Sequence, residues 1–185
     1  MTDLSRRQFF AASGAAAAAI WITAESRDLL AAGMHAAQAT RFENLTPADA
    51  ADLDAATAQI IPSDGTPGAR EARVVYFLDK SLGTFAKDQK PTFEKVTKEL
   101  RARAAKAKRG AKSFAELSSA QQISVLTALE KEKPEIFGPL RYATMAGMLA
   151  NPEYGGNLNK TGWKMIGFVD QFSWSAPFGW YDKNA

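Results

Sequence analysis

The stretch TPADAADLDAATAQIIPSDGTPGAREARVVYFLDKSLG, residues 46–83, contains the pattern of two helices joined by a loop. Thr46 followed by Pro47 is typical of a helix start, because a threonine side chain caps a free backbone N–H and a proline in the first turn gives up no hydrogen bond. Three apolar residues then share one face of the predicted helix: Leu53, Ala56 and Ile60. Pro62 ends this pattern, so the sequence predicts a helix followed by the loop PSDGTPGA.

A second helix is predicted after this loop. Thr66 and Pro67 repeat the cap-and-proline pattern, so we expect them to open it. Its expected buried stripe has four members: Val74, Val75, Leu78 and Leu82. Gly83 follows the stripe, at a place where a glycine in the left-handed conformation commonly ends a helix. Residues 46–83 therefore predict a helix–loop–helix unit.

Residues 92–112 form a third helical pattern, which is unusually basic. Phe93, Val96 and Leu100 lie on one side of it. The other positions include eight lysines and arginines: Lys95, Lys98, Arg101, Arg103, Lys106, Lys108, Arg109 and Lys112. A solvated helix face explains these charges most simply, and a contact with phosphate or with an acidic partner is the alternative. We do not expect nucleic acid as a partner.

Two more helices are predicted further along the chain. Ser118 and Gln121 have the spacing of a capping box, and they precede three apolar positions: Ile123, Leu126 and Leu129. Residues 134–149 form the next pattern, with four expected core residues: Phe137, Leu140, Met145 and Met148. No segment shows the alternation typical of a β-strand. The sequence therefore predicts an all-α fold, a small single-domain helical bundle with a loop-rich, aromatic C-terminal segment.

The last 35 residues differ from the rest of the chain. They hold eight of its 19 aromatic residues, and glycines and a proline interrupt any long helix. A glycine-rich loop cannot easily bury so much aromatic surface, so we expect an exposed apolar patch that contacts a partner. Three aromatic residues near the end of the chain are expected contacts: Phe172, Trp174 and Trp180. The alternative, that this segment folds back and completes the core, stays open.

The N-terminal stretch SRRQFFAASGAAAAAIWI, residues 5–22, resembles an export signal. Its apolar run is shorter than the roughly 20 residues that span a membrane, and its alanines offer little surface to a core. Four residues match the twin-arginine box, through which folded proteins are exported: Ser5, Arg6, Arg7 and Phe9. An ordinary N-terminal helix is the alternative. We expect the twin-arginine export machinery as a partner and the periplasm as the location, with the protein either free there or associated with the inner membrane.

The end of this leader is marked by a single motif of small residues. Ala37-Gln38-Ala39 fits a cleavage site, although it lies far beyond the apolar run. We therefore divide the chain into a twin-arginine leader, residues 1–39, and a helical small-subunit domain, residues 40–185. Whether the leader is cleaved stays open.

The composition excludes several kinds of site. The chain has no cysteine, and its one histidine, His35, lies in the expected leader. The helical domain therefore lacks the ligands of covalent haem, of iron–sulfur clusters and of thiolate zinc, and it lacks the histidine of a Ser-His-Asp triad. We expect no catalytic residue, no cofactor and no metal in this chain. Its 46% hydrophobic residues, 23% charged residues and net charge of +3 are those of an ordinary globular domain.

Two stretches of the helical domain carry recognisable motifs. IIPSDGTPGAREARVVYFLDKSL, residues 60–82, contains TPGA and a later FLD, and NPEYGGNLNKTGWKMIGF, residues 151–168, contains NPxYGGN followed by GWKxIGF. Both stretches resemble signatures of the gluconate 2-dehydrogenase subunit 3 family, and they occur in the family's order. With the helices between them, they extend the resemblance over about residues 45–170.

This resemblance implies a small, non-catalytic accessory subunit of a periplasmic FAD-dependent sugar or sugar-acid dehydrogenase. Similar proteins pair with a large FAD subunit of the glucose-methanol-choline oxidoreductase type, often alongside a cytochrome c, so the FAD would belong to the partner in a heterodimer. The small subunit would assist the folding or stability of the flavoprotein. The small subunit would also carry the flavoprotein across the inner membrane. A folded protein that has no leader can be exported only while it is bound to a protein that has one. The sugar, the stoichiometry and the presence of a cytochrome stay open.

The resemblance also implies roles for single residues. A structured loop and helix start would be formed by the first motif: Asp64, Thr66, Pro67, Gly68 and Ala69. A contact surface on the flavin subunit would be formed by the second: Tyr154, Gly155, Gly156, Asn157, Gly162 and Trp163. A turn-forming role for Asp64 and a tight, internally packed turn at the two adjacent glycines are the alternatives.

Two other classes of function stay open beside the accessory subunit. A small enzyme could use carboxylates such as Asp64 and Asp170 as general acid and base. A free-standing periplasmic helical binding module would instead line a pocket with its aromatic residues. Whether the chain is itself an enzyme is therefore not decided by the sequence.

Overall fold

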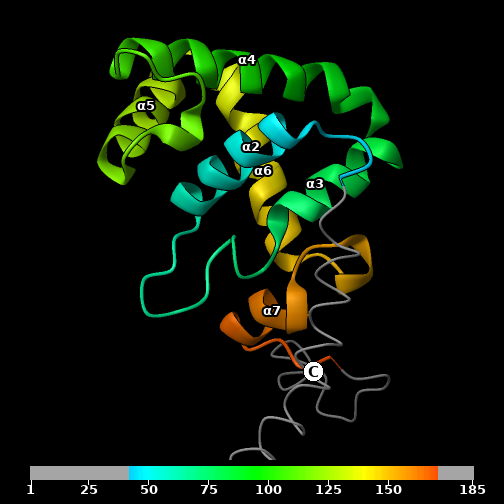
Figure 1. The fold of residues 1–185 in the computed structure, drawn as a ribbon. Coiled ribbons are helices and arrows are strands. Elements are labelled where there is room, and N and C mark those ends of the chain that lie inside the picture. Colours follow the sequence, from blue (N-terminus) through cyan, green and yellow to red (C-terminus); the bar gives the residue numbers. More distant parts are fainter. Residues whose placement is uncertain (1–41, 171–185) are drawn as a thin grey trace, which may run out of the picture. The chain divides into compact units, whose positions relative to one another are not determined.

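The computed structural model describes residues 42–170, and these residues form six α-helices and four short 3₁₀ turns without a β-strand. This confirms the predicted all-α fold. The helices, which Figure 1 labels, are α2 (Pro47–Ile60), α3 (Val74–Gly83), α4 (Lys90–Ala107), α5 (Ser119–Glu132), α6 (Pro134–Leu149) and α7 (Thr161–Met165). None of the described helices combines the length and the apolarity that crossing a membrane requires.

The expected leader lies outside the described residues. The four residues of the twin-arginine box are among those not described: Ser5, Arg6, Arg7 and Phe9. The same holds for three of the expected partner contacts: Phe172, Trp174 and Trp180.

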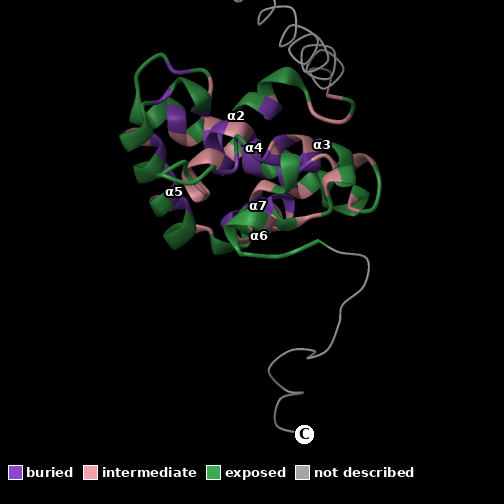
Figure 2. Ribbon diagram, turned by 90° about the horizontal axis from the view of Figure 1, so that it is seen from below, coloured by how far each residue is buried: buried purple, intermediate pink, exposed green. Residues whose placement is uncertain are grey.

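Helix α6 is central to the described part of the chain. It contacts α2, α3, α4, α5 and α7, and in Figure 1 it runs from α4 toward the turns around α7. The core that these helices share includes five fully buried large side chains: Leu53, Leu78, Leu100, Phe114 and Leu129. Figure 2 shows the buried residues on the inner faces of the helices and the exposed ones on their outer faces.

The predicted starts of α2 and α5 are confirmed. The Thr46 side chain accepts a hydrogen bond from the Asp49 backbone N–H at 3.1 Å, and Pro47 is the first residue of α2. Ser118 and Gln121 form both hydrogen bonds of a capping box at the start of α5. These signals are local, since each depends on residues within one turn of the helix.

The predicted start of the second helix is wrong. Helix α3 begins at Val74, seven residues after Pro67, because Arg73 has a left-handed backbone with φ of 55° and separates α3 from the preceding turn. Residues 68–73 form this turn, in which the Ala72 N–H donates to the Gly68 carbonyl. The Thr66 hydroxyl lies 3.5 Å from the Asp64 carboxylate and caps no helix.

Two further expectations need correction, at Gly83 and Met145, and one residue of the apolar pattern of α5 lies outside the core. Gly83 is the last residue of α3 without being left-handed, and a Cβ there would overlap with the Asn44 side chain. Ile123 is 51% exposed, because α5 buries the face that carries Val125, Leu126 and Leu129 instead. Met145 is 45% exposed, on a face of α6 that no other described helix covers. The predicted stripe of α3 is buried as expected.

Two buried carboxylates join segments that are distant in the sequence. Asp52 of α2 accepts hydrogen bonds from the Phe114 N–H at 2.7 Å and from Arg101 Nε at 2.6 Å. Asp79 of α3 accepts from the backbone N–H groups of residues 43, 44 and 45 at 2.8–3.0 Å. An ionised carboxylate makes stronger hydrogen bonds than a neutral acceptor, so Asp79 fixes the segment that leads into α2.

We predict that Asp79→Asn lowers the free energy of unfolding by about 2–4 kcal/mol, because the amide keeps one acceptor oxygen, loses the negative charge and must turn its NH₂ group toward at least one of the three backbone N–H donors. Urea denaturation of the full chain measures this. Asp64→Asn is the control, since Asp64 is exposed and a surface change of this kind costs less than about 0.5 kcal/mol. Equal stability of the two variants would contradict the role given to Asp79.

Candidate partner-binding surface

The segment after α6 turns back and packs on the end of that helix. Asn157, in the middle of the segment, is fully buried. Its side-chain amide donates to the Ala150 carbonyl at 2.8 Å, and its side-chain oxygen accepts from the Gly162 N–H at 2.8 Å. The Leu158 N–H reaches the Ala72 carbonyl at 3.2 Å. Asn157 therefore holds three parts of the chain together: the end of α6, the turn itself and the start of α7.

Two glycines allow this segment to approach the backbone of α6. A Cβ at Gly156 would overlap with the carbonyl oxygen of Gly147, and a Cβ at Gly162 would overlap with that of Met148. Backbone atoms on α6 cannot move aside as the end of a flexible side chain can. The NPxYGGN and GW motifs therefore encode close contact between two pieces of backbone.

This contact places Tyr154 next to aromatic residues of another element. The ring of Tyr154 packs edge-on against Phe85, with 5.6 Å between ring centroids, and Phe85 packs against Phe77 of α3 at 6.1 Å. Lys80 of α3 donates to the Glu153 carbonyl at 2.5 Å and so ties the same turn to α3. Tyr154 is 48% exposed and Phe85 is 62% exposed, so both offer ring surface to solvent.

An apolar groove of about 530 Å³ lies beside Phe85. It is bounded by α3, by the turn after α3, by Phe93 of α4, and by the face of α6 that carries Pro139, Tyr142 and Ala146. Ser81 and Gln89 are its polar lining residues, and no charged residue is among the described residues that line it. We call this hollow, together with the adjoining ring of Tyr154, the α3–α6 groove.

Exposed apolar side chains continue from the groove along α6. Tyr142, Met145 and Leu149 follow at helical spacing and are 71%, 45% and 41% exposed. Met165 and Ile166 of the α7 region are exposed as well. Monomeric proteins rarely leave large contiguous apolar patches in water, and such patches mark contact sites for partners. The α3–α6 groove and this stripe therefore form the candidate partner-binding surface.

The structure divides the predicted contact residues of the second motif into two groups. Tyr154 belongs to the candidate surface. Trp163 is half-buried, and its indole N–H donates to the Leu149 carbonyl at 2.7 Å, so it anchors α7 to α6. Gly156, Asn157 and Gly162 are buried and hold the turn, so they can position a contact surface without being part of it. Gly155 lies between the groups, half-buried, with φ of 95°.

The loop of the first motif is structured, although it does not start a helix. Glu71 accepts hydrogen bonds from the Ser63 hydroxyl at 2.6 Å and from the Gly68 N–H at 2.9 Å. The hydrogen bond from Ser63 is the main cause that lowers the pKa of Glu71. Gly68 and Ala69 are buried beneath the loop. Three of the expected loop residues are exposed: Asp64, Thr66 and Pro67.

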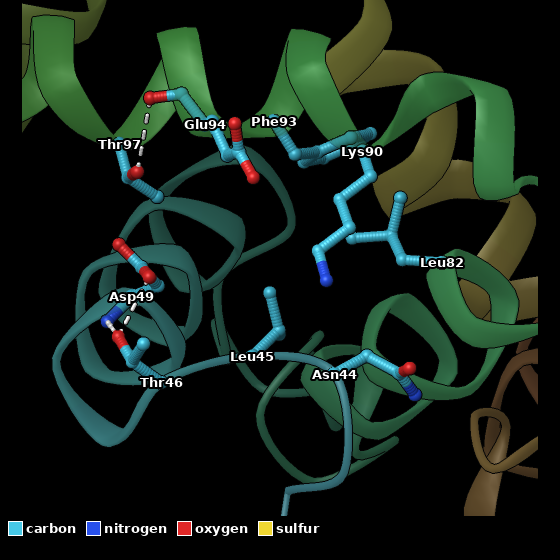
Figure 3. Close-up of a pocket in the computed structure, with 9 residues that line it drawn as sticks. All are labelled: Asn44, Leu45, Thr46, Asp49, Leu82, Lys90, Phe93, Glu94 and Thr97. Carbon is cyan, nitrogen blue, oxygen red and sulfur yellow. Dashed lines mark hydrogen bonds between the residues drawn. The ribbon is translucent and has the colours of Figure 1, made fainter.

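A smaller pocket of about 190 Å³ lies between the start of α2 and α4. Figure 3 shows the Lys90 amine extending into it. Sites for small molecules usually have about 300–1,000 Å³. Burial raises the pKa of Asp49 at its edge, but hydrogen bonds from Thr46 and Arg101 outweigh this and lower it. A carboxylate that is ionised at neutral pH is a poor general acid, so this pocket does not suggest a catalytic site.

The carboxylates of the enzyme alternative do not meet at a pocket. Asp170 forms an ion pair with Lys160 at 2.7 Å, and Asp64 lies on the exposed loop. Neither lines the α3–α6 groove or the smaller pocket. Within residues 42–170, no three His, Cys, Asp or Glu side chains are grouped as a metal site would require.

Sequence patterns did not reveal Phe85 and Tyr142. Phe85 follows the predicted end of its helix, and Tyr142 lies within a helix whose predicted core residues do not include it. One signal was available, because Tyr142 lies two positions away from the buried Leu140 and therefore faces another side of α6. No local signal shows that α3 leaves this side uncovered.

Comparison with protein families gave one match. A family model described as gluconate 2-dehydrogenase subunit 3 matches residues 47–170, which include every described helix. The search of curated proteins and the search of solved structures gave no match.

We predict that Gly162→Ala lowers the free energy of unfolding by at least about 2 kcal/mol, because the new methyl group overlaps with backbone. Gly138→Ala is the matched control: it lies inside α6 with open space where a Cβ would be added, and since the following Pro139 opposes the gain in helix propensity, stability should change by less than about 1 kcal/mol. Thermal and urea denaturation measure both. A Gly162→Ala variant as stable as wild type would contradict the close packing.

Proposed function

Because the chain belongs to the gluconate 2-dehydrogenase subunit 3 family, we propose that it is the non-catalytic small subunit of a periplasmic FAD-dependent sugar or sugar-acid dehydrogenase. In this proposal the chain binds the large flavoprotein subunit, stabilises it and carries it through the twin-arginine export route. The observation that carries this proposal is the α3–α6 groove, an uncovered apolar surface in a chain whose family is a dehydrogenase subunit.

The chemistry of the groove supports a protein partner. Its lining is almost entirely apolar, so it gains most from an apolar segment of another chain. Exposed tyrosine and phenylalanine rings, such as those of Tyr142 and Phe85, are typical anchors of protein interfaces. A sugar needs several hydrogen-bond partners, and the groove offers few, so a free-standing sugar-binding module is less well supported.

The flavin belongs to the partner in this proposal. A dinucleotide cofactor needs donors or cations for its pyrophosphate, and no charged side chain is among the described residues that line the groove. Ser81 donates its hydroxyl to the Leu78 carbonyl and is therefore already engaged. The small subunit accordingly supplies surface and stability to the complex, while the reaction takes place in the large subunit.

The N-terminal sequence supports the export role. Arg6 and Arg7 precede an apolar run, as in leaders that are read by the machinery for folded proteins. A flavoprotein that folds around FAD in the cytoplasm and has no leader could follow this chain across the membrane only while bound to it. A periplasmic complex, in contact with a cytochrome c where one is present, would be the result.

We predict that replacing Arg6 and Arg7 together by lysine leaves the flavoprotein partner in the cytoplasm, since the paired guanidinium groups are the recognised feature of the leader. Cell fractionation followed by flavin and activity measurements in each fraction tests this. Arg27→Lys, which lies in the leader outside the box, is the control and should leave export unchanged. A flavoprotein that still reaches the periplasm with the Lys-Lys leader would contradict the carrier role, and dehydrogenase turnover by the isolated chain would contradict the non-catalytic one.

A further inference from the structure

Helix α4 and the turn that follows it carry an unusual concentration of positive charge. Between Lys90 and Lys112 the chain has nine basic residues and two acidic ones, a net charge of +7 in a chain whose total is +3. The charge is one-sided: Lys95, Lys98 and Lys106 are exposed, whereas the opposite face of α4 buries Phe93 and Leu100.

Part of this charge is used inside the fold. Arg101 forms ion pairs with Asp49 at 2.7 Å and with Asp52 at 2.6 Å. Arg103 pairs with Glu99 and with Glu132 at 2.9 and 2.8 Å. These arginines attach α4 to α2 and α5, so they explain why that helix is basic in its middle.

The exposed lysines are not explained in this way. Within the described part of the chain, no ion pair involves Lys95, Lys98 or Lys106, although acidic side chains are available on neighbouring turns. Their spacing of three and eight residues places them along one side of the helix. This side therefore presents a row of cations to whatever lies outside the molecule.

The same face lacks anchors for a specific protein contact. Ala102 and Ala105 lie between the lysines and are exposed. The exposed large apolar side chains of residues 42–170 belong to other elements, and none is on α4. Protein interfaces depend on buried aromatic or large apolar anchors, whereas adsorption to a charged surface needs charge alone. A row of lysines separated by alanines therefore favours adsorption to a charged surface over a specific protein contact.

The position of α4 leaves this face accessible. Figure 1 shows α4 along one edge of the described helices, with α7 and the C-terminal turns at the other end of α6. The single residue that α4 contributes to the α3–α6 groove is Phe93, on its inner side. A partner in the groove would therefore contact the side of α4 that carries no lysine row.

We propose that the outer face of α4 binds an anionic phospholipid bilayer, through lysines 95, 98 and 106 and the neighbouring Arg109 and Lys112. This goes beyond the proposed function and does not depend on it, because it concerns a different face and needs no flavoprotein. Each lysine near an anionic membrane strengthens binding about fivefold. Ions screen such an attraction, so binding falls as the salt concentration rises.

The test is co-sedimentation of the full chain with vesicles of phosphatidylcholine alone and with vesicles that contain about one third phosphatidylglycerol. The leader, with its apolar run and its arginines, is part of the full chain, so the excess on anionic vesicles measures the electrostatic binding of the whole chain, and the triple variants assign that binding to a face. We expect stronger binding to the anionic vesicles, with the excess lost between about 0.05 and 0.5 M salt. Equal binding to both vesicle types would overturn the proposal.

Two triple variants separate this face from net charge. Lys95→Gln, Lys98→Gln and Lys106→Gln together should weaken binding to the anionic vesicles at least tenfold. The control combines Lys87→Gln, Lys131→Gln and Lys164→Gln, which remove the same charge from exposed positions on three other elements. An equal loss in both variants would overturn the proposal. The proposal would also be overturned if the variant of lysines 95, 98 and 106 bound vesicles as wild type does but no longer bound an acidic protein. The face would then be a protein contact.

A labelled chain gives a second readout that does not depend on these variants. The protein has no cysteine, so Ala102→Cys places a single fluorescent label in the middle of the face. Its emission should shift to the blue on anionic vesicles. The same label at Ala120→Cys, exposed at the start of α5, should shift much less. Equal shifts at the two positions would contradict a bilayer contact through α4.

Discussion

The close contact between the turn after α6 and the backbone of α6 itself decides the form of the candidate surface. Gly156 and Gly162 lie directly on the carbonyl groups of Gly147 and Met148, and Asn157 supplies the hydrogen bonds between them. Any side chain at these glycines would push the turn away. Because the turn stays close, Tyr154 reaches Phe85, and the ring surface beside the groove becomes continuous.

Buried side chains that hydrogen-bond to a distant backbone segment also occur elsewhere in the described structure. Asp52 and Asp79 each use a buried carboxylate to hold the backbone of a distant segment, as Asn157 does with an amide. Every buried polar side-chain atom of the described residues has a hydrogen-bond partner. A small helical domain thereby fixes its non-helical segments without disulfides, and the α3–α6 groove lies between two helices of this domain.

Much of the helical fold could be predicted from the sequence, because its signals are local. The caps at Thr46 and Ser118 and the buried stripe of α3 each follow from residues within a few turns. The start of α3 could not be predicted, since the left-handed Arg73 overrides a good cap signal at Thr66. Gly83 shows the same limit: its reason is the side chain of Asn44, which is distant in sequence.

The candidate site was predicted only in part. The second motif pointed to the region, and Tyr154 lies in the surface, but the motif's glycines and Asn157 are inside the fold. The groove arises where α3 and α6 fail to cover one another, so it depends on packing between residues that are distant in the sequence, such as Phe85 and Tyr142. Asp79 belongs to the first motif, and its role became clear only from its three backbone donors.

The central claim is that the α3–α6 groove binds the flavoprotein, and co-purification of a flavin-containing polypeptide with tagged variants tests it most directly. Tyr142→Glu places a charge on the groove, and Ile123→Glu places the same charge on an exposed apolar position of α5. We expect the first variant to lose at least about nine tenths of the bound flavoprotein, as interface anchors do, and the second to retain it. Equal retention by both variants would contradict the claim.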